Sequence, residues 1–308
     1  MPQPQEITQI AIVGGGLMGT GIAEVTAVAG YPTTVIKATG GDPTEIERRI
    51  ARSMERRIER GQLSADARDT ALANLRFTPD RDALADVDLV VESIVEDLAT
   101  KRALFADLAP RLQPGCVLAS NTSTLRISDL ARDSARADRT IGLHFFSPVP
   151  AMKLVELAHL PVTNPAVLAA AQRFVTGLGK TAVPVLDSTG FVVNRLLVPF
   201  LLGAINAYEQ GLATADQIDT AMKLGCGHPM GPLALSDLIG LDIVYAMAKL
   251  LYADFDDARY RPPALLRRLV QDGHLGKKTG LGFYDYGQRP AVANADIEAL
   301  VRGGALAA

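Results

Sequence analysis

Short apolar runs alternate with segments of helical apolar spacing over the first 187 residues. This alternation predicts an α/β domain in which a doubly wound, parallel sheet carries helices on both faces, a Rossmann-like arrangement. Helices are expected over 17–29, 43–59, 101–112 and 166–177. Strands are expected over 7–13, 33–36, 88–92, 116–119, 140–144, 153–157 and 181–185.

The pattern changes after Asp187. From Phe191 onward the apolar spacing is helical and strand signals stop, which predicts an all-α second domain. We therefore expect a domain over 1–187 and a helical domain over 188–308. The helical patterns of the second domain cover 194–210, 215–224, 232–252 and 263–272, and a glycine-rich stretch, 276–287, indicates a loop.

Composition narrows the class of protein. Apolar residues make up 48% and charged residues 21%, as in ordinary globular proteins. A net charge of −3 gives no electrostatic support for binding nucleic acid or a membrane surface. The two cysteines are far apart in sequence and show no metal-ligand spacing, so no metal site is expected and a reducing cytosol fits. The absence of a signal-peptide pattern and of a run of about 18 apolar residues leads us to expect a cytoplasmic protein.

A glycine fingerprint follows the first predicted strand. Gly14, Gly16 and Gly19 have the spacing G-x-G-x-x-G, and Leu17 and Met18 begin the next helix. In this context the first glycine permits the turn, the second permits close approach of a pyrophosphate, and the third lets helix pack on strand. The helix N-terminus then offers N–H groups to the phosphates. These five residues are predicted to bind a dinucleotide.

Lys37 stands where NAD-binding versions of this fold place an acid, at the end of the second strand. A lysine does not accept hydrogen bonds from the ribose hydroxyls. It could pair with a 2′-phosphate, which favours NADP, or it could be solvated while Thr39 or backbone groups hold the ribose. The cofactor is thus expected to be NAD or NADP.

His144 lies at the end of an apolar run beside a turn, and Glu156 follows inside the next apolar run. A histidine with a carboxylate partner is the simplest proton acceptor that works near neutral pH. Together with a dinucleotide, such a base implies hydride transfer from an alcohol or to a ketone.

Five motifs occur in an order and spacing that closely resemble the 3-hydroxyacyl-CoA dehydrogenase family, especially the single-function bacterial 3-hydroxybutyryl-CoA dehydrogenases. They are VVESIVED at 90–97, ASNTS at 119–123, LHFFSP at 143–148, GFVVNR at 190–195 and HPMGP at 228–232. The resemblance extends from about residue 7 to 286 and includes GKKTGLGFY at 276–284.

The resemblance implies roles for the acid–base pair and for the groups that hold the substrate. His144 matches the general base and Glu156 the carboxylate that orients its ring. Ser123 and Asn194 match the residues that hold the reacting oxygen and the acyl carbonyl, where donors stabilise developing charge.

Three further residues match positions on the cofactor side. Glu96 and Lys101 match positions that line the nicotinamide, and Asn121 follows a strand end, at the rim where open α/β sheets bind ligands. The resemblance also implies an acyl-CoA thioester as substrate and a homodimer.

The helix over 43–59 carries a basic stripe that includes Arg52 and Arg56, opposite an apolar stripe. A solvated face is the usual meaning of such a stripe. The resemblance instead implies that Arg52 and Arg56 meet the phosphates of CoA, which guanidinium groups suit.

Besides Lys37, two residues depart from the family pattern. Ser147 stands where asparagine is usual, and Gly227 precedes His228 where asparagine is frequent. Two other functions stay open. The same chemistry could act on an acyl-carrier-protein thioester or a free hydroxy acid, or the chain could bind a cofactor without turnover, as crystallin-like relatives do.

Overall fold

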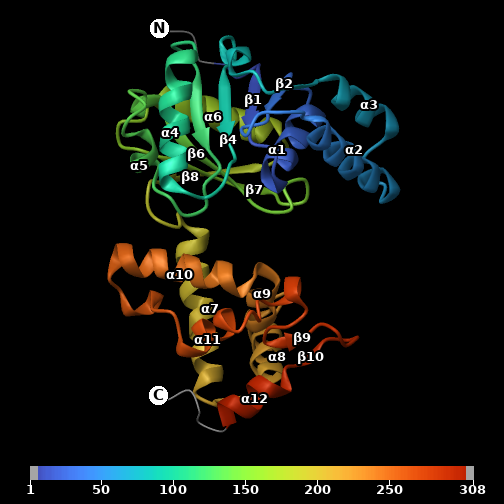
Figure 1. Cartoon of the computed structure of the whole chain (residues 1–308), viewed down its shortest axis with the longest axis vertical. Helices are drawn as coiled ribbons and strands as arrows, with labels where there is room; N and C mark the ends of the chain where they lie inside the picture. The colour runs from blue at the N-terminus through green and yellow to red at the C-terminus, as the bar shows by residue number, and fades with distance from the viewer. Residues whose placement is uncertain (1–5, 303–308) are drawn as a thin grey trace. The chain divides into compact units, whose positions relative to one another are not determined.

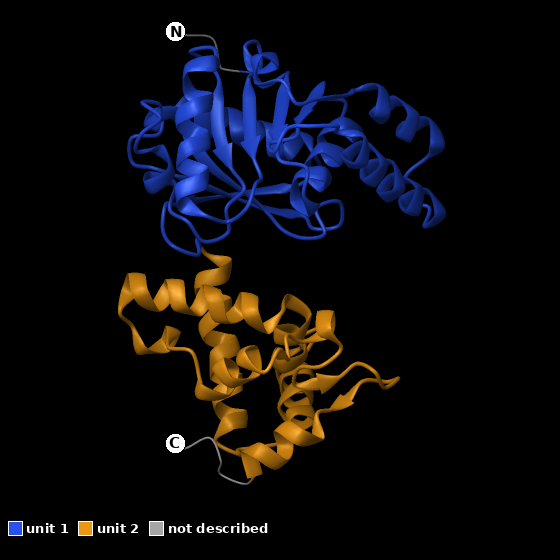
Figure 2. Ribbon diagram, viewed as in Figure 1, with its two compact units in different colours: residues 1–191 blue, residues 192–308 orange. Residues whose placement is uncertain are grey.

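The computed structural model describes residues 6–302. The chain divides into two compact units, residues 1–191 and residues 192–308 (Figure 2). Among residues 6–302, no helix combines the length and the apolar character needed to cross a membrane.

Unit 1 is built on one eight-stranded sheet with the order β3-β2-β1-β4-β5-β6-β7-β8 (Figure 1). The Rossmann-like fold class is confirmed. The strands are β1 (Ile10–Val13), β2 (Thr33–Ile36), β3 (Leu75–Thr78), β4 (Leu89–Glu92), β5 (Val117–Ser120), β6 (Thr140–Phe145), β7 (Leu154–His159) and β8 (Thr181–Leu186).

One pair of neighbours in the sheet is antiparallel, namely β6 and β7, whereas every other neighbouring pair is parallel. The sheet is parallel, as expected, except at this one pair. Only residues 146–153 connect the two strands, and a parallel crossover needs a dozen residues or more. The short connection therefore reverses the chain direction.

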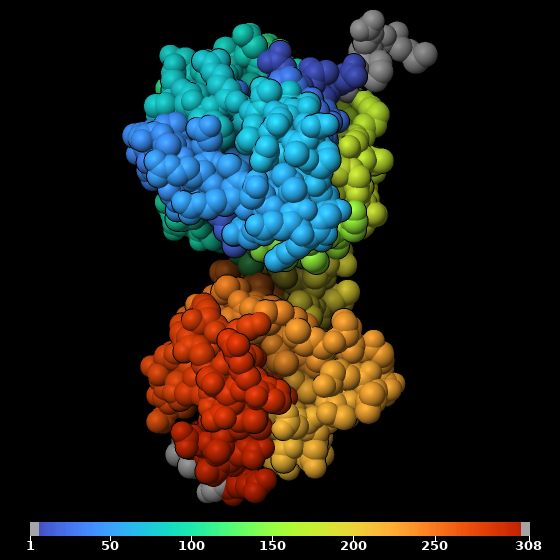
Figure 3. All heavy atoms as spheres, turned by 90° about the vertical axis from the view of Figure 1, so that its right-hand side faces the viewer, coloured from blue at the N-terminus to red at the C-terminus, as the bar shows by residue number. Residues whose placement is uncertain are grey.

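Helices cover both faces of the sheet. The side chains of Ile10 and Ile12 belong to the apolar core beneath α1 (Leu17–Val28), α2 (Thr44–Glu59) and α6 (Pro165–Gly177). The other face of the sheet packs against the helices α4 (Leu98–Leu108) and α5 (Ile127–Ala131). Short α3 (Ala65–Ala73), α5 and the edge strand β3 were not predicted. In Figure 3, the visible face of unit 1 is formed largely by the blue and cyan atoms of α2, α3 and the segment that follows.

The carboxyl ends of the central strands lie level with one another. Val13 pairs with Glu92, and Glu92 pairs with Ser120, so β1, β4 and β5 end at one edge. The strand order reverses between β1 and β4. Open α/β sheets bind ligands at such a switch point, outside the carboxyl ends.

Unit 2 is a helical domain, as expected, with a core of its own. The single helix expected over 232–252 is two helices, because Gly240 has a φ of 104° that breaks the helix. A short antiparallel ribbon of β9 (Tyr284–Asp285) and β10 (Val292–Ala293) was not predicted. The helices are α7 (Val193–Glu209), α8 (Ala215–Cys226), α9 (Pro232–Ile239), α10 (Leu241–Phe255), α11 (Ala264–Gln271) and α12 (Ala295–Arg302).

A buried carboxylate joins the helices of unit 2 to its C-terminal ribbon. Asp237 accepts hydrogen bonds from the backbone N–H groups of Phe283 (3.0 Å) and Tyr284 (2.9 Å). Burial raises the pKa of Asp237 to about 6, the two backbone N–H groups oppose this shift, and the charge of Asp219 adds to it. The ribbon is thus anchored by a group that titrates in mildly acidic solution.

Candidate active site

The glycine turn after β1 leaves room where a diphosphate is expected. A Cβ on Gly14 would lie 2.2 Å from the Ser93 carbonyl oxygen, and one on Gly19 would lie 2.1 Å from the Gly14 carbonyl oxygen. A Cβ on Gly16 would meet nothing within 4 Å. The helix α1 begins at Leu17, directly after Gly16, so its first N–H groups face this open space. These residues fit the diphosphate of a dinucleotide.

At the end of β2 the structure places a cation. Lys37 Nζ donates a hydrogen bond to the backbone carbonyl of Asp42 at 3.0 Å. The Asp42 carboxylate is exposed and accepts from the Thr44 backbone N–H at 2.9 Å, at the start of α2. Hydrogen bonds from Thr44 hold the pKa of Asp42 below its usual range. Lys37 therefore follows β2 directly, where a ribose acid is usual, and its ammonium is bonded to the turn before α2.

His144 and Glu156 form a buried pair across β6 and β7. The antiparallel register places them directly opposite each other, and His144 Nδ1 lies 2.8 Å from Glu156 Oε2. Both side chains are at most 5% exposed. Since an ionised carboxylate only accepts hydrogen bonds, a neutral imidazole paired with it has its proton on Nδ1 and its lone pair on Nε2. The rings of Phe146 and Phe191 lie 4.4 and 5.7 Å from the imidazole centre.

Asn121 ties the end of β5 to the strand of this histidine. Its Oδ1 accepts a hydrogen bond from the Phe145 backbone N–H at 2.9 Å. Phe145 is the neighbour of His144 on β6. The side chain of Asn121 thereby fixes the spacing between the turn after β5 and the residue that follows the histidine.

Glu96 holds the turn that contains Ser123. One carboxylate oxygen, Oε1, accepts from Thr122 Oγ1 (2.6 Å), the Ser123 N–H (2.9 Å) and the N–H and hydroxyl of Thr124 (3.2 and 3.1 Å). The other oxygen lies 3.3 Å from Lys101 Nζ. Burial favours the neutral acid, but the charge of Lys101 and these donors outweigh it and lower the pKa of Glu96. The carboxylate is therefore anionic at neutral pH.

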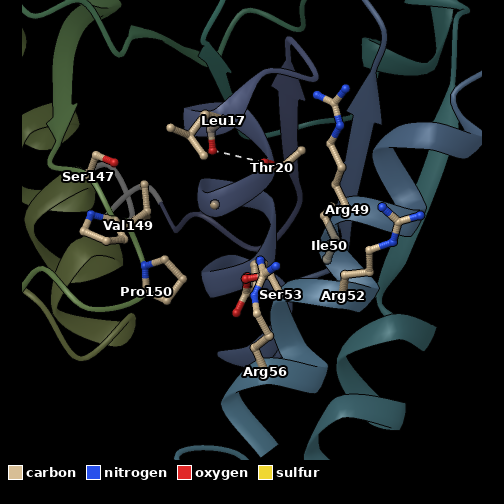
Figure 4. A pocket seen from close by; sticks show the side chains of 13 residues that line it. Leu17, Thr20, Arg49, Ile50, Arg52, Ser53, Arg56, Ser147, Val149 and Pro150 are labelled. Atoms are coloured by element: carbon tan, nitrogen blue, oxygen red, sulfur yellow. Dashed lines mark hydrogen bonds between the residues drawn. The ribbon is translucent and has the colours of Figure 1, made fainter. Parts of the chain in front are cut away.

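A pocket of about 440 Å³ lies between α1, α2 and the loop after β6 (Figure 4). The predicted phosphate ligands Arg52 and Arg56 line it from α2, together with Arg49. Ser147 and Pro150 line it from the loop, on the other side of the pocket (Figure 4). Its remaining lining residues are Leu17, Thr20, Gly21, Glu24, Ile50, Ser53, Pro148 and Val149.

Two family models match almost the whole chain. The model described as the NAD binding domain of 3-hydroxyacyl-CoA dehydrogenase matches residues 9–188, and that of the C-terminal domain matches residues 190–286. The chain belongs to the 3-hydroxyacyl-CoA dehydrogenase family. The resemblance of its motifs is thereby confirmed.

Relatives within the 3-hydroxyacyl-CoA dehydrogenase family are similar over their full length. A 3-hydroxybutyryl-CoA dehydrogenase of Mycobacterium tuberculosis is 46% identical, with 91% of this chain and 99% of the relative covered. The crystal structure of M. tuberculosis FadB2 matches with a TM-score of 0.88 at 46% identity, over 91% of this chain and 99% of that one. That of (S)-3-hydroxybutyryl-CoA dehydrogenase PaaH1 from Ralstonia eutropha matches with a TM-score of 0.89 at 40% identity, over 92% and 100%.

Most of the residues singled out in the sequence lie in unit 1 of this family member. The glycine turn, Lys37, the Ser123 turn, the histidine–carboxylate pair and the pocket arginines all belong to it. Asn194 lies in unit 2, in the first turn of α7.

Glu92 is part of the same strand edge but was not predicted as a site residue. It is fully buried at the end of β4 and lies 2.5 Å from Lys101 Nζ. An acid that ends an otherwise apolar strand beside the switch point is a signal that could have identified it, because buried carboxylates are rare unless paired.

Proposed function

We propose that this chain transfers hydride between a nicotinamide dinucleotide and C3 of a short-chain 3-hydroxyacyl- or 3-ketoacyl-CoA, with His144 as the general base. The buried pair of His144 and Glu156 carries the proposal. A histidine held by a carboxylate, as His144 is held opposite Glu156, can act as an oriented proton acceptor. Relatives that are named 3-hydroxybutyryl-CoA dehydrogenase support the same reaction class.

In the oxidative direction, His144 Nε2 takes the proton of the C3 hydroxyl as the C3–H bond breaks. Glu156 stabilises the imidazolium that forms and keeps the ring from rotating. A nicotinamide dinucleotide, held by the turn at Gly14–Gly19, supplies the acceptor for the hydride. In the reductive direction the imidazolium returns its proton to the carbonyl oxygen.

Ser123 and Asn194 are proposed to hold the oxygens of the substrate. The hydroxyl of Ser123 and the amide of Asn194 can both donate hydrogen bonds to an oxygen on which charge develops. Glu96 supports the role of Ser123, because its bonds to the backbone of the turn fix where that side chain starts.

The pocket supports a CoA thioester as the substrate. Arg52 and Arg56 line one wall from α2, and Ser147, three residues after the base, lines the opposite wall. A phosphorylated carrier held at α2 would then direct its acyl end toward the strand that carries His144. A free hydroxy acid has no phosphates for this wall.

Lys37 supports NADP as the cofactor. Its ammonium lies at the end of β2, where the ribose of a dinucleotide is expected. A 2′-phosphate would replace the backbone carbonyl of Asp42 as the hydrogen-bond acceptor of this ammonium. Matched titrations of NADH and NADPH with acetoacetyl-CoA test this part.

The main test compares acetoacetyl-CoA, an acetoacetyl carrier protein and free acetoacetate at equal concentration. We expect reduction of the CoA thioester to be the most efficient and His144→Ala to abolish it. The double substitution R52A/R56A should raise the KM for acetoacetyl-CoA and leave that for a phosphate-free thioester such as acetoacetyl-N-acetylcysteamine unchanged.

Arg48→Ala is the matched control, because Arg48 is exposed on the same helix and pairs with Glu45. Full activity of H144A would contradict the base, and a KM that is unaffected by R52A/R56A would contradict the CoA site. A folded wild-type protein without cofactor-dependent turnover would support a non-catalytic, crystallin-like role instead.

A further inference from the structure

Glu92 and Lys101 form a buried ion pair that the proposed reaction does not use directly. Glu92 is 0% exposed and Lys101 is 1% exposed, and the ammonium lies 2.5 Å from Glu92 Oε1. Removing two charges from water is costly, and the attraction between them compensates only when the geometry is good and further hydrogen bonds are made. The structure provides those further bonds.

The carboxylate of Glu92 connects three segments at the strand edge. Its Oε2 accepts from Ser120 Oγ at 2.6 Å, at the end of β5. Its Oε1 accepts from the Ile94 N–H at 2.7 Å, in the chain that leaves β4, and from Lys101 on α4. Glu92 is therefore a common anchor for β5, the loop after β4 and the first turns of α4.

Lys101 passes this anchoring on to the Ser123 turn. Its ammonium lies between Glu92 and Glu96, at 2.5 and 3.3 Å. Glu96 binds Lys101 with Oε2 and the backbone N–H of Ser123 with Oε1. The position of the ammonium thus determines where Glu96, and with it the turn, can rest.

Loss of the charge at Glu92 alone would change this balance. Lys101 would keep one anionic partner, Glu96, which is 39% exposed. Because a buried ammonium without its counter-ion is unfavourable, Lys101 would move toward Glu96 and draw that carboxylate from the turn.

We propose that Glu92 is a positioning residue: through Lys101 and Glu96 it fixes the turn that carries Ser123, and so places the Ser123 hydroxyl for the substrate oxygen. The kinetic readout of this inference rests on the proposed dehydrogenase function. The proposal predicts that a change at Glu92 alters kcat through Ser123. A purely structural role for Glu92 predicts an effect on kcat that does not depend on Ser123.

The test is a double-mutant cycle with E92Q, S123A and E92Q/S123A in acetoacetyl-CoA reduction. Gln keeps the shape and an acceptor for Ser120. A displacement of about 1 Å can cost about 100-fold in rate, so we expect E92Q to lower kcat by about 10- to 100-fold. The double variant should be no slower than S123A. If Glu92 acts only by placing the Ser123 hydroxyl, the E92Q substitution has no further effect once that hydroxyl is absent. E92D, which restores the charge, should recover part of the lost kcat.

Asp107→Asn is the matched control, since Asp107 pairs with Arg81 and Arg111 in the same unit without contacting the turn. It should leave kcat unchanged. Hydrogen exchange of the peptide that contains residues 121–125 should rise in E92Q and not in the control, which tests the positioning independently of turnover. If E92Q does not fold, E92Q/K101M removes both charges and enters the same cycle with S123A.

Additive effects of E92Q and S123A, or unchanged exchange of the turn, would overturn the proposal. An inactive wild-type protein in which E92Q still loosens the turn would instead contradict the proposed function and leave the positioning intact.

Discussion

Replacing Glu156 by Gln tests how much the buried pair contributes to the reaction. The substitution keeps the size of the side chain and an oxygen that can accept from His144 Nδ1, but it removes the negative charge. In the wild type the two groups are 2.8 Å apart and both at most 5% exposed. The change therefore isolates the electrostatic stabilisation of the imidazolium that forms during oxidation.

The magnitude follows from the distance and the burial. Two unit charges about 4 Å apart interact by about 4 kcal/mol at an effective dielectric constant of about 20. A neutral hydrogen bond from the glutamine oxygen retains about 1 kcal/mol of this. The remaining loss of about 3 kcal/mol corresponds to a decrease in kcat of about 100-fold, at about 1.4 kcal/mol for each factor of ten.

The assay follows the formation of NADH or NADPH from the oxidised cofactor and 3-hydroxybutyryl-CoA at fixed pH. His159→Gln is the matched control, because His159 lies at the end of the same strand β7, where its Nδ1 is 3.4 Å from the backbone carbonyl oxygen of Leu160. We expect H159Q to have the kcat of the wild type. A folded E156Q protein within threefold of the wild-type kcat would refute the role given to the pair.

Three further outcomes follow from other contacts. K37D should reduce kcat/KM with NADPH far more than with NADH; equal effects on both cofactors would show that Lys37 does not bind a 2′-phosphate. K180M should lower the urea midpoint of unfolding, because Lys180 Nζ donates to the carbonyl oxygens of Val149 and Met152, each at 2.6 Å. Each buried group left unpaired costs about 1–3 kcal/mol, and an unchanged midpoint would contradict this prediction. Burial raises the pKa of Asp237 to about 6, so the native state holds this proton more tightly than the unfolded state does, and the free energy of unfolding should fall by about 3 kcal/mol as pH rises from about 3 to 7. Urea unfolding at a series of pH values should show this decrease in the wild type and not in D237N, and parallel pH curves would contradict it.

The alternation of strands and helices predicted the layers of unit 1 because each pattern has its own period. The glycine spacing likewise predicted the turn after β1. The direction of β7 was missed, although the short segment 146–153 limits it. The same antiparallel register is what places His144 opposite Glu156, so their spacing in the sequence indicated a pair without the geometry that makes it one.

Other features depend on contacts between distant segments. Glu92 meets Lys101 and Ser120 only once three elements converge on one strand edge. The pocket forms where α2 faces the loop after β6, and neither segment alone indicates it. The ribbon of unit 2 consists of two-residue strands, too short for any period to be visible.

The most direct test of the proposed hydride transfer uses 3-hydroxybutyryl-CoA that carries deuterium at C3. Incubated with the protein and the preferred oxidised cofactor, it should yield reduced cofactor with one deuterium at C4 of the nicotinamide ring, in an amount equal to the acetoacetyl-CoA formed. Mass spectrometry and proton NMR of the isolated cofactor measure this. Reduced cofactor without deuterium, or no reduced cofactor from the folded protein, would contradict the proposed reaction.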